Sequence, residues 1–591
     1  MNGIDLPGDI GPNTKIMQKG GPEMSVRTGQ IFGIWMLASA SMFGFGLFAQ
    51  EWTFSDVTQD SGLSFDPAIE RDWTGVAAGD YDGDGWVDLL ITPDTLAPNQ
   101  LYRNQGDGTF TEVALDAGVS LVGNSFRSAL FFDYNNDGRL DIIFAPSDFI
   151  KTPRIFNNLG NGRFSEVTET TGLSCQWQVF SIAAGDYDLD GDQDLYFGIN
   201  DPDKGAGHLW QNQGDGTFVN VAEAAGIGPL ENQDFNLEFT PSFADVNGDR
   251  YPDLLIVADF NNTQLYINNR DGTFTNATTP VFTDEGGMGS GIADYDNDGD
   301  LDWFVSSIWD PDQDPDKPWG VSSGNRLYRN NGSGVFEDAT DEAGVRNGYW
   351  GWGSTFADLD NDGDLDLFHT NGFVDPEGPF FRDDPSRTFI NNGDGTFTEM
   401  GATIGLADTG MGHGAVVLDY DGDGDLDLFI ANSIEPPRLY RNDGGNSRNA
   451  IHVKLVGLDR NTQGIGARVY LDHEGQTQMR EINSGNNFLS QNPTSAHFGI
   501  GDAAESQVTV TWPSGVRMRV DKVQAGETLK VPELSVSFDD PEIDFFPYFY
   551  QVDQRLKAYM ASNLLTQSEA GRIKANAIKA FIQNRFLKTG Q

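Results

Sequence analysis

The chain has 591 residues and a formal net charge of −52 at pH 7, from 89 acidic and 37 basic side chains. So strong a negative charge excludes nucleic acid as an expected partner, because the phosphates would be repelled. The single cysteine, Cys175, excludes an intrachain disulfide. We therefore expect Cys175 to be a small buried apolar residue, and stability to come from packing and bound metal.

The first 49 residues predict a secretory signal. An uncharged apolar run extends from Ile31 to Ala49 and follows Arg27, with cleavage expected after Ala49 and Met24 as an alternative start. A retained membrane anchor is the alternative, because the run is nearly long enough to cross a bilayer. We expect an exported protein that is periplasmic, at the cell surface or extracellular, with no stable membrane span unless this run is retained.

One acidic loop of nine residues, Asp-x-Asp/Asn-x-Asp-Gly-x-x-Asp, recurs seven times between residues 80 and 427. Every copy has oxygen donors at positions 1, 3, 5 and 9. The seven donor sets, here numbered as loops one to seven, are Asp80, Asp82, Asp84 and Asp88; Asp133, Asn135, Asp137 and Asp141; Asp186, Asp188, Asp190 and Asp194; Asp245, Asn247, Asp249 and Asp253; Asp294, Asp296, Asp298 and Asp302; Asp358, Asp360, Asp362 and Asp366; and Asp419, Asp421, Asp423 and Asp427.

This donor spacing predicts up to seven Ca²⁺ sites. A hard cation takes six to eight oxygens, and no Cys or His stands in the pattern, which argues against zinc. Position 6 is Gly in six copies because the chain must turn there, whereas loop four has Arg250 and we expect its site to be weak or empty. Acidic surface turns without metal are the alternative. Seven copies, with repelling carboxylates in each, favour the metal.

Short apolar runs and Gly-rich turns between the loops predict four strands per repeat, and thus an all-β, seven-bladed β-propeller. The third strand recurs as Leu-Tyr-Arg-Asn, for example at residues 101–104, and a hairpin leads to a strand that begins with Phe. Repeat seven lacks its fourth strand. Residues 52–57 match that strand in sequence, so we expect the N-terminal strand to complete the last blade and close the ring.

The face of the propeller opposite the loops carries two long insertions, residues 309–324 and 372–387, and a set of aromatic residues. We predict that partners bind on this face, with blades five and six dominant. The predicted contact residues are Trp73, Trp177, Trp309, Trp319, Tyr349, Trp350 and Trp352. The alternative is that these rings fill the central channel.

An enzyme is the second hypothesis. A carboxylate pair among Asp310, Asp312, Asp314 and Asp316 would suit a secreted hydrolase acting on polysaccharide. The six His are scattered, however, and no nucleophile elbow is present. Solvated insertion loops explain the acidic residues equally well, so we predict a binding protein, not an enzyme.

Residues 450–533 alternate apolar and polar positions, which predicts a small β domain packed on the propeller. Residues 541–591 predict a basic helical tail, with a capping box at Thr566 and Glu569. This tail is expected to dock on the acidic body or on another anionic surface. An ordinary solvated basic face is the alternative.

The loops and hairpins of residues 50–446 resemble the FG-GAP/VCBS repeats of integrin-type propellers. The segment that follows resembles the ASPIC/UnbV domain in three motifs, residues 464–469 (GIGARV), 484–491 (SGNNFLSQ) and 512–515 (WPSG). Together they resemble the cartilage acidic protein family. The resemblance implies an exported calcium-binding protein with a role in adhesion, whose protein or glycan partner and oligomeric state are left open.

Overall fold

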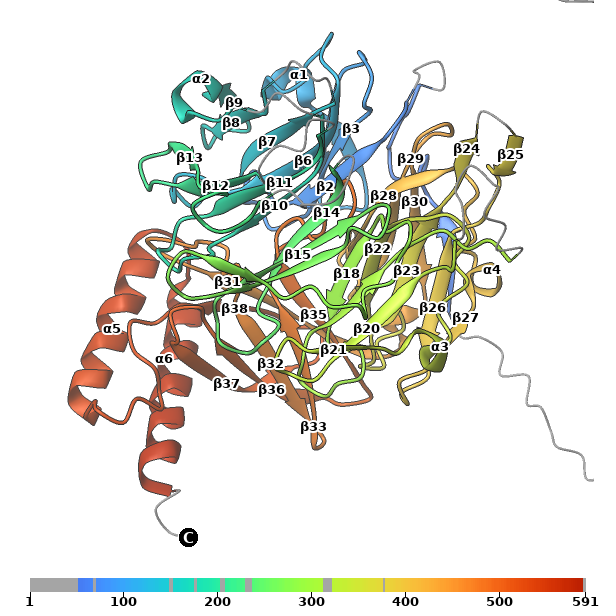
Figure 1. Cartoon of the computed structure of the whole chain (residues 1–591). Helices are drawn as coiled ribbons and strands as arrows, with labels where there is room; N and C mark the ends of the chain where they lie inside the picture. The colour runs from blue at the N-terminus through green and yellow to red at the C-terminus, as the bar shows by residue number, and fades with distance from the viewer. Residues whose placement is uncertain are drawn as a thin grey trace, which may run out of the picture. The chain divides into compact units, whose positions relative to one another are not determined.

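Each acidic loop joins the first and second strands of a four-stranded antiparallel unit in the computed structural model (Figure 1). The structure describes residues 52–66, 71–147, 152–174, 178–201, 208–228, 236–311, 322–375 and 378–587. The predicted signal segment 1–49, Cys175, Trp177 and Trp319 lie outside the described residues. What was predicted for them stays a prediction.

The described residues form seven such units, of which the third and fourth also pair with each other through β11 and β14. In chain order the blades are β2 (Gly75–Gly79), β3 (Asp88–Thr92), β4 (Gln100–Asn104), β5 (Phe110–Glu112); β6 (Phe126–Phe132), β7 (Asp141–Pro146), β8 (Arg154–Asn158), β9 (Phe164–Glu166); β10 (Gln178–Gly185), β11 (Asp194–Asp201), β12 (Leu209–Asn212), β13 (Phe218–Asn220); β14 (Asn236–Ala244), β15 (Asp253–Ala258), β16 (Gln264–Asn268), β17 (Phe274–Asn276); β18 (Ser290–Ala293), β19 (Asp302–Val305), β20 (Arg326–Asn330), β21 (Phe336–Asp338); β22 (Gly351–Ala357), β23 (Asp366–Asn371), β26 (Arg387–Asn391), β27 (Phe397–Glu399); and β28 (Gly412–Leu418), β29 (Asp427–Asn432), β30 (Arg438–Asp443), β1 (Thr53–Asp56). The all-β propeller prediction is confirmed.

Two sets of contacts close the ring. The first strands of successive blades contact one another in the order β2, β6, β10, β14, β18, β22, β28 and back to β2. The N-terminal strand β1 pairs antiparallel with β30, with Phe54 opposite Asn442. The predicted closure by residues 52–57 is therefore confirmed, because β1 supplies the fourth strand of blade seven.

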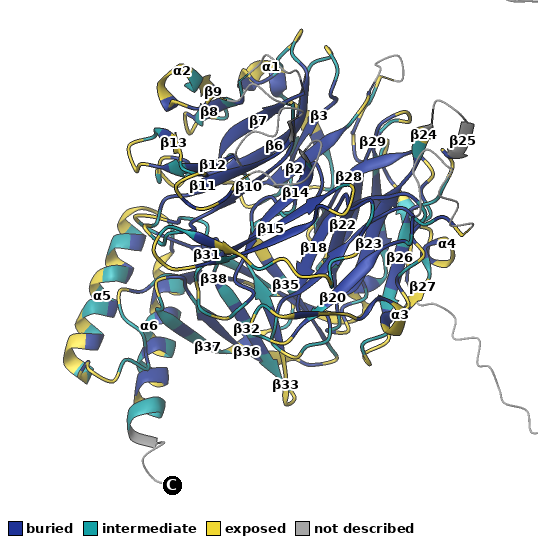
Figure 2. Cartoon of the chain, in the orientation of Figure 1, coloured by how far each residue is buried: buried dark blue, intermediate teal, exposed yellow. Residues whose placement is uncertain are grey.

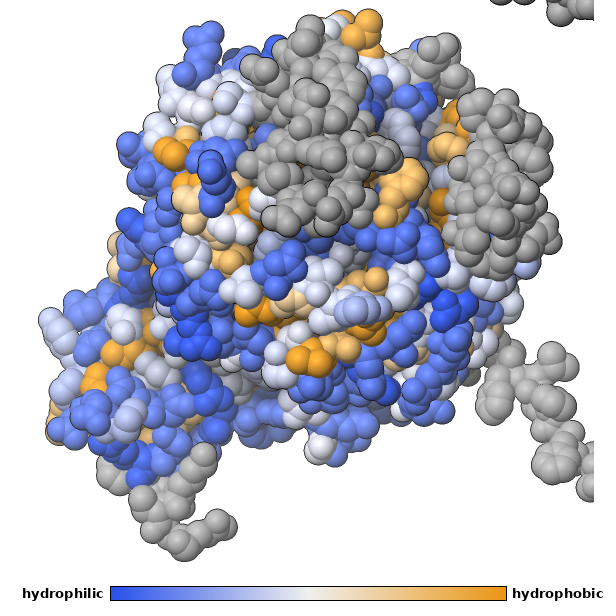
Figure 3. All heavy atoms as spheres, in the orientation of Figure 1, coloured by the Kyte–Doolittle hydropathy of each residue, from blue (hydrophilic) through white to orange (hydrophobic). Residues whose placement is uncertain are grey.

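Apolar side chains pack between every two neighbouring blades, where the sheets face each other. Most residues of the blade strands are accordingly buried (Figure 2). Leu90 and Phe144, for example, are fully buried between blades one and two. Each such side chain contributes roughly 1.5–3 kcal/mol by leaving water. The described surface seen in Figure 3 is largely hydrophilic, with apolar patches between.

Smaller elements decorate the blades. Four short helices, α1 (Ala114–Ala117), α2 (Thr168–Thr171), α3 (Thr340–Ala343) and α4 (Gly401–Ile404), follow outer strands, and the hairpin β24 (Phe373–Asp375) and β25 (Gly378–Phe381) lies within the second predicted insertion.

The C-terminal part forms two further sheets, ordered β35-β31-β38 and β33-β32-β36-β37, against which a helical hairpin packs through α6 and β37. Its elements are η1 (Gly445–Ser447), β31 (Asn449–Val456), β32 (Arg468–His473), β33 (Gln476–Glu481), β34 (Ser490–Gln491), β35 (Ser495–Gly501), β36 (Glu505–Thr511), β37 (Arg517–Gln524), β38 (Thr528–Pro532), α5 (Phe545–Ala561), α6 (Gln567–Ile582) and η2 (Gln583–Leu587). Among the described residues, no helix has both the length and the apolar character needed to cross a bilayer.

The helical hairpin docks on the body of the protein. Its capping box forms as predicted, with the Glu569 N–H donating to Thr566 at 3.2 Å. Basic side chains of the hairpin form ion pairs with acidic residues outside it: Arg555 with Asp459, Arg572 with Glu527 and Lys579 with Asp521. Of the alternatives considered for this tail, docking on the acidic body is the one observed.

Candidate metal sites on the loop face

The first Asp of every loop accepts the backbone N–H of position 6, and this contact folds the loop. In loop one the Gly85 N–H donates to Asp80 Oδ2 at 3.1 Å, and in loop four the Arg250 N–H donates to Asp245 Oδ2 at 2.8 Å. Position 6 has a left-handed backbone, with φ of 101° at Gly85 and 77° at Arg250. Glycine avoids the strain of this conformation, whereas Arg250 adopts it at a cost of roughly 1–2 kcal/mol.

Position 4 needs the same backbone, which the sequence analysis overlooked. It has positive φ in all seven loops and is Gly83, Asn136, Leu189, Gly248, Asn297, Asn361 and Gly422. Six of these are Gly or Asn, the residue types that tolerate this region best, so the signal was present in the sequence.

The ninth Asp of each loop opens the second strand of its blade and is buried in every copy. In loop one the Tyr81 N–H donates to Asp88 Oδ2 at 3.2 Å and the Asn104 N–H to Oδ1 at 2.8 Å. Both bonds favour the carboxylate, but burial outweighs them and raises the pKa of Asp88 to about 8. Burial likewise raises the pKa of Asp253 to about 8.

An Asn at the end of each third strand links neighbouring loops. Asn268 donates its N–H to Asp253 Oδ1 of its own loop at 2.8 Å and its side-chain amide to the carbonyl of Tyr187, in the loop of the preceding blade, at 2.7 Å. The equivalent amide bonds around the ring are Asn104 to Tyr420, Asn158 to Tyr81, Asn212 to Tyr134, Asn330 to Val246, Asn391 to Tyr295 and Asn442 to Leu359. The recurring Leu-Tyr-x-Asn motif signalled these residues, which the sequence analysis assigned only to a strand.

Five loops bring three carboxylates together closely enough for one ion. In loops one, three, five, six and seven, an oxygen from each of three Asp lies within 4.8 Å of the others. The two remaining loops are those with Asn at position 3. In loops one, three and five, the first Asp (Asp80, Asp186 and Asp294) has a buried Oδ1 without a hydrogen-bond partner. A hard cation with oxygen ligands fits such a donor set.

Arginine side chains also contact the loops. Arg103 pairs with Asp82 and Asp84 at 2.5 and 2.8 Å. In loop four Arg270 pairs with Asp249 at 2.7 Å, while the side chain of Arg250 points to the carbonyl of Pro513 at 3.4 Å. Arg250 therefore contacts the C-terminal domain instead of the loop interior, and the weakness of loop four stays a prediction.

The C-terminal domain contacts the loop face, by which we mean the end of the propeller that carries the seven loops. Lys454 pairs with Asp80 at 2.8 Å, Thr462 donates to Asp133 at 2.5 Å and Arg468 lies 3.4 Å from Asp245. The Gly499 N–H donates to Asp358 at 2.9 Å, and His452 lies 3.6 Å from Asp419. Five of the seven first carboxylates thus contact this domain.

Residues 484–492, here called the plug segment, enter the central channel from the same side. Phe488 and Leu489 are fully buried there. The Asn487 side chain accepts the Ser354 N–H at 2.6 Å, and Gln491 bonds the N–H and carbonyl of Phe131 at 2.7 and 2.8 Å. Since the first strand of a blade has a free edge in the channel, the plug segment satisfies backbone groups that would otherwise need water.

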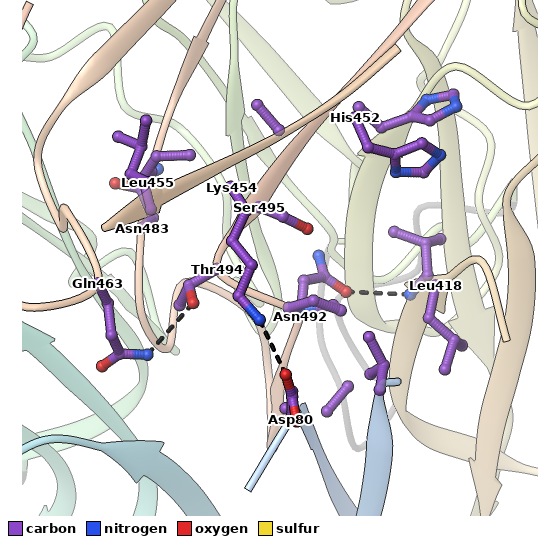
Figure 4. Close-up of a pocket in the computed structure, with 18 of the residues that line it drawn as sticks. Asp80, Leu418, His452, Lys454, Leu455, Gln463, Asn483, Asn492, Thr494 and Ser495 are labelled. Atoms are coloured by element: carbon purple, nitrogen blue, oxygen red, sulfur yellow. Dashed lines mark hydrogen bonds and ion pairs between the residues drawn. The ribbon is translucent and has the colours of Figure 1, made fainter. Parts of the chain in front are cut away.

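A cavity of about 840 Å³ remains between the loop face and the C-terminal domain (Figure 4). Its wall includes Asp80 with Lys454, and Gln463, whose amide donates to Thr494 at 3.2 Å. The cavity therefore borders the first carboxylate of loop one and the residue that pairs with it.

The predicted aromatic contact surface needs correction. Trp350 and Trp352 are buried, and Trp352 packs against Phe488 of the plug segment at a ring distance of 5.3 Å. Trp73 stacks on His413 at 4.5 Å in the same region. The prediction of an exposed surface is wrong for Trp350 and Trp352, because the channel must be filled with apolar side chains. Trp73, Trp309 and Tyr349 are partly exposed, so a contact role for them stays a prediction.

The hydrolase hypothesis concerns acidic residues that fall mostly outside the described residues. Asp312, Asp314 and Asp316 lie there, and Asp310 is buried with its N–H donating to the Ser322 carbonyl at 3.0 Å. No observation on the described residues favours this hypothesis.

The fold and the loops define a class of protein, a closed seven-bladed propeller with acidic metal-type loops on one face. Family models agree. The FG-GAP-like repeat model matches residues 80–144, 133–197, 186–256, 245–305, 309–369 and 380–430, and the ASPIC and UnbV model matches residues 457–537. The chain belongs to the family of FG-GAP-repeat proteins with an ASPIC/UnbV domain that includes the cartilage acidic proteins.

Two relatives show how far the chain has diverged in sequence from the cartilage acidic proteins. The chain is 25% identical to cartilage acidic protein 1 of Xenopus tropicalis over 79% of its own length and 65% of the relative's, and 29% identical to that of Homo sapiens over 47% and 40%. It therefore spans less than two thirds of the length of these relatives.

Among solved structures, Sqt1 of Saccharomyces cerevisiae is similar at a TM-score of 0.36 and 10% identity, over 63% of this chain and 97% of that one. YCF48 from Cyanidioschyzon merolae also gives 0.36, at 11% identity, over 66% and 98%. Similarity at this level carries no functional conclusion.

Proposed function

We propose that this protein is an exported calcium-binding β-propeller that acts as an adhesion or protein/glycan interaction module, with calcium mainly structural. The observation that carries the calcium proposal is the buried, unpartnered Oδ1 of Asp80, Asp186 and Asp294. A buried polar atom without a partner costs roughly 1–3 kcal/mol, and an ion bound in the loop would supply the missing interaction. The clustered carboxylates also repel one another unless a cation offsets them.

The face opposite the loops is the proposed partner surface. The C-terminal domain contacts the loop face, whereas the links between second and third strands emerge at the other end of the blades. Three of these links carry large exposed apolar side chains, Leu96, Phe260 and Ile434, with exposed fractions of 65, 51 and 48%. Exposed apolar side chains on loops commonly take part in protein contacts.

Calorimetric titration of metal-stripped protein with Ca²⁺ tests the first half of the proposal. Binding of several ions is expected, and no binding would contradict it. Capture of native partners by the wild type and by the variant Leu96→Asp/Ile434→Asp tests the second half. Partner capture should fall in this variant and persist in Leu159→Asp, whose side chain is 51% exposed in the hairpin between β8 and β9, at the loop end of the blades. Equal capture by both variants would contradict a partner site on this face.

A further inference from the structure

The C-terminal domain contacts the same oxygen of the first Asp in each of five loops. In loops one, two, four, six and seven, Oδ2 faces the C-terminal domain and also accepts the N–H of position 6. Among the described residues, no hydrogen bond or ion pair joins the other oxygen, Oδ1, to that domain, and Asp80 Oδ1 has no hydrogen-bond partner. The two oxygens of one carboxylate thus face two different occupants, the domain and the loop interior.

The groups that reach Oδ2 differ in charge. Loop one receives an ammonium from Lys454 and loop four a guanidinium from Arg468, whereas loop two receives the Thr462 hydroxyl and loop six the Gly499 N–H. A cation on one oxygen of a carboxylate repels a metal ion on the other oxygen, and a hydroxyl or amide does not.

We propose that Lys454 is a built-in counter-ion that lowers the Ca²⁺ affinity of loop one, and that Arg468 does the same for loop four. The inference rests on the calcium proposal above. In the absence of metal these cations offset the carboxylate charge and hold the C-terminal domain against the propeller. A divalent ion in the loop removes part of the charge that attracts them, so metal filling and the ion pair oppose each other. The first carboxylates of loops two and six lack this opposition, although Arg139 pairs with Asp137 and Arg448 with Asp360 in those loops.

Loop one offers a local reporter for a test. Trp86 stands at position 7 of this loop, so Tb³⁺ bound there should emit light when tryptophan is excited. The Trp86 ring also lies against Gly422 of loop seven, so only the emission that disappears in both Trp86→Phe and Asp82→Asn belongs to loop one. Its displacement by Ca²⁺ gives the affinity of that loop. The measurement uses the full chain and requires no known partner.

Lys454→Met should bind Ca²⁺ at loop one about tenfold more tightly, because the Lys454 side chain is close to Asp80 but partly screened by solvent. Lys454→Arg keeps the charge and should behave like the wild type. Lys522→Met is the matched control, since Lys522 pairs with Glu505 away from the loops and its loss should leave the affinity unchanged.

Two results would overturn the inference, and they are distinguishable. If the wild type shows loop-one emission that Ca²⁺ displaces but Lys454→Met binds with equal or lower affinity, the counter-ion role is wrong and the calcium proposal stands. If the wild type gives no loop-one emission, the calcium proposal fails for this loop and the role of Lys454 fails with it. Far-ultraviolet circular dichroism of each variant establishes that it is folded.

Discussion

The two ends of the propeller differ in the kinds of side chain they carry and in what those side chains contact. The loop face holds the densest charge in the chain, yet its first and ninth carboxylates are held by backbone N–H groups and its surface contacts the C-terminal domain. The opposite end has aromatic side chains sealed in the channel and exposed apolar side chains in its links. The recurring acidic motif therefore marks the end of the propeller whose polar groups contact other parts of the same chain.

The packing between blades and the loop face stabilise the protein in different ways. Between the blades, apolar packing is spread over seven similar clusters. At the loop face, stability depends on charges that are unfavourable until they are offset. Conditions that change the metal or the proton concentration should thus affect the loop face far more than the rest of the molecule.

Removal of Ca²⁺ should produce the largest effect. One site filled at a hundred times its dissociation constant contributes about 2.7 kcal/mol, and several loops add together, so chelation should lower the melting temperature by about 10 °C or more. Differential scanning fluorimetry with and without chelator measures this shift, and Mg²⁺ in excess over the chelator serves as the control. An unchanged melting temperature would show that calcium is not structural.

The plug segment gives the next largest effect. Leu489→Asp places a charge in the fully buried channel and should cost about 4 kcal/mol or detach the C-terminal domain from the propeller. Limited proteolysis should then cut between the two parts in the variant. Leu115→Asp, at an exposed position, is the control and should resist like the wild type. Equal resistance of Leu489→Asp would mean that the plug segment does not hold the two parts together.

Local repetition made the propeller and the loops predictable. Donor spacing, position-6 glycines and the orphan strand at residues 52–57 are all visible in the sequence, because each depends on residues close to it or on an exact repeat. The role of the Asn that ends each third strand depends on the neighbouring blade, and the plug segment reaches the channel from more than 40 residues beyond β30 in sequence. Burial of Trp352 likewise follows from Phe488, which no local pattern connects with it.

The ring of Asn bonds predicts a smaller effect. Asn268→Ala removes the amide bonds to the carbonyls of Tyr187 and Pro252, which are buried between blades three and four. Leaving these carbonyls without a donor should cost about 2 kcal/mol. Asn269→Ala, one residue further on in an exposed hairpin, is the matched control and should cost less than about 0.5 kcal/mol. Urea denaturation in saturating Ca²⁺ compares the two, and equal stabilities would contradict a structural role for the ring.

The smallest expected effect is a pH-dependent change in the melting temperature of the metal-free protein. An unfolded Asp has a pKa near 3.9, whereas burial raises the pKa of Asp88, Asp141 and Asp253 to about 8 in the folded, metal-free protein. The folded state then holds protons more tightly, so these residues stabilise it below about pH 4 and this contribution is lost as the pH rises to 8. Metal-stripped protein should therefore melt a few degrees lower at pH 8 than at pH 5.

Calcium should reverse this trend, because the ion binds the deprotonated carboxylates and competes with protons. The increase in melting temperature caused by saturating Ca²⁺ should grow from pH 5 to pH 8. Binding at pH 6 should also release protons. Titration calorimetry in buffers of different ionisation enthalpy measures this proton release. Asp253→Asn keeps the shape of the side chain without the titration and should weaken the pH dependence of the metal-free form. If the melting temperature of the metal-free protein instead rises from pH 5 to pH 8, the buried carboxylates do not control the stability of the metal-free loop face.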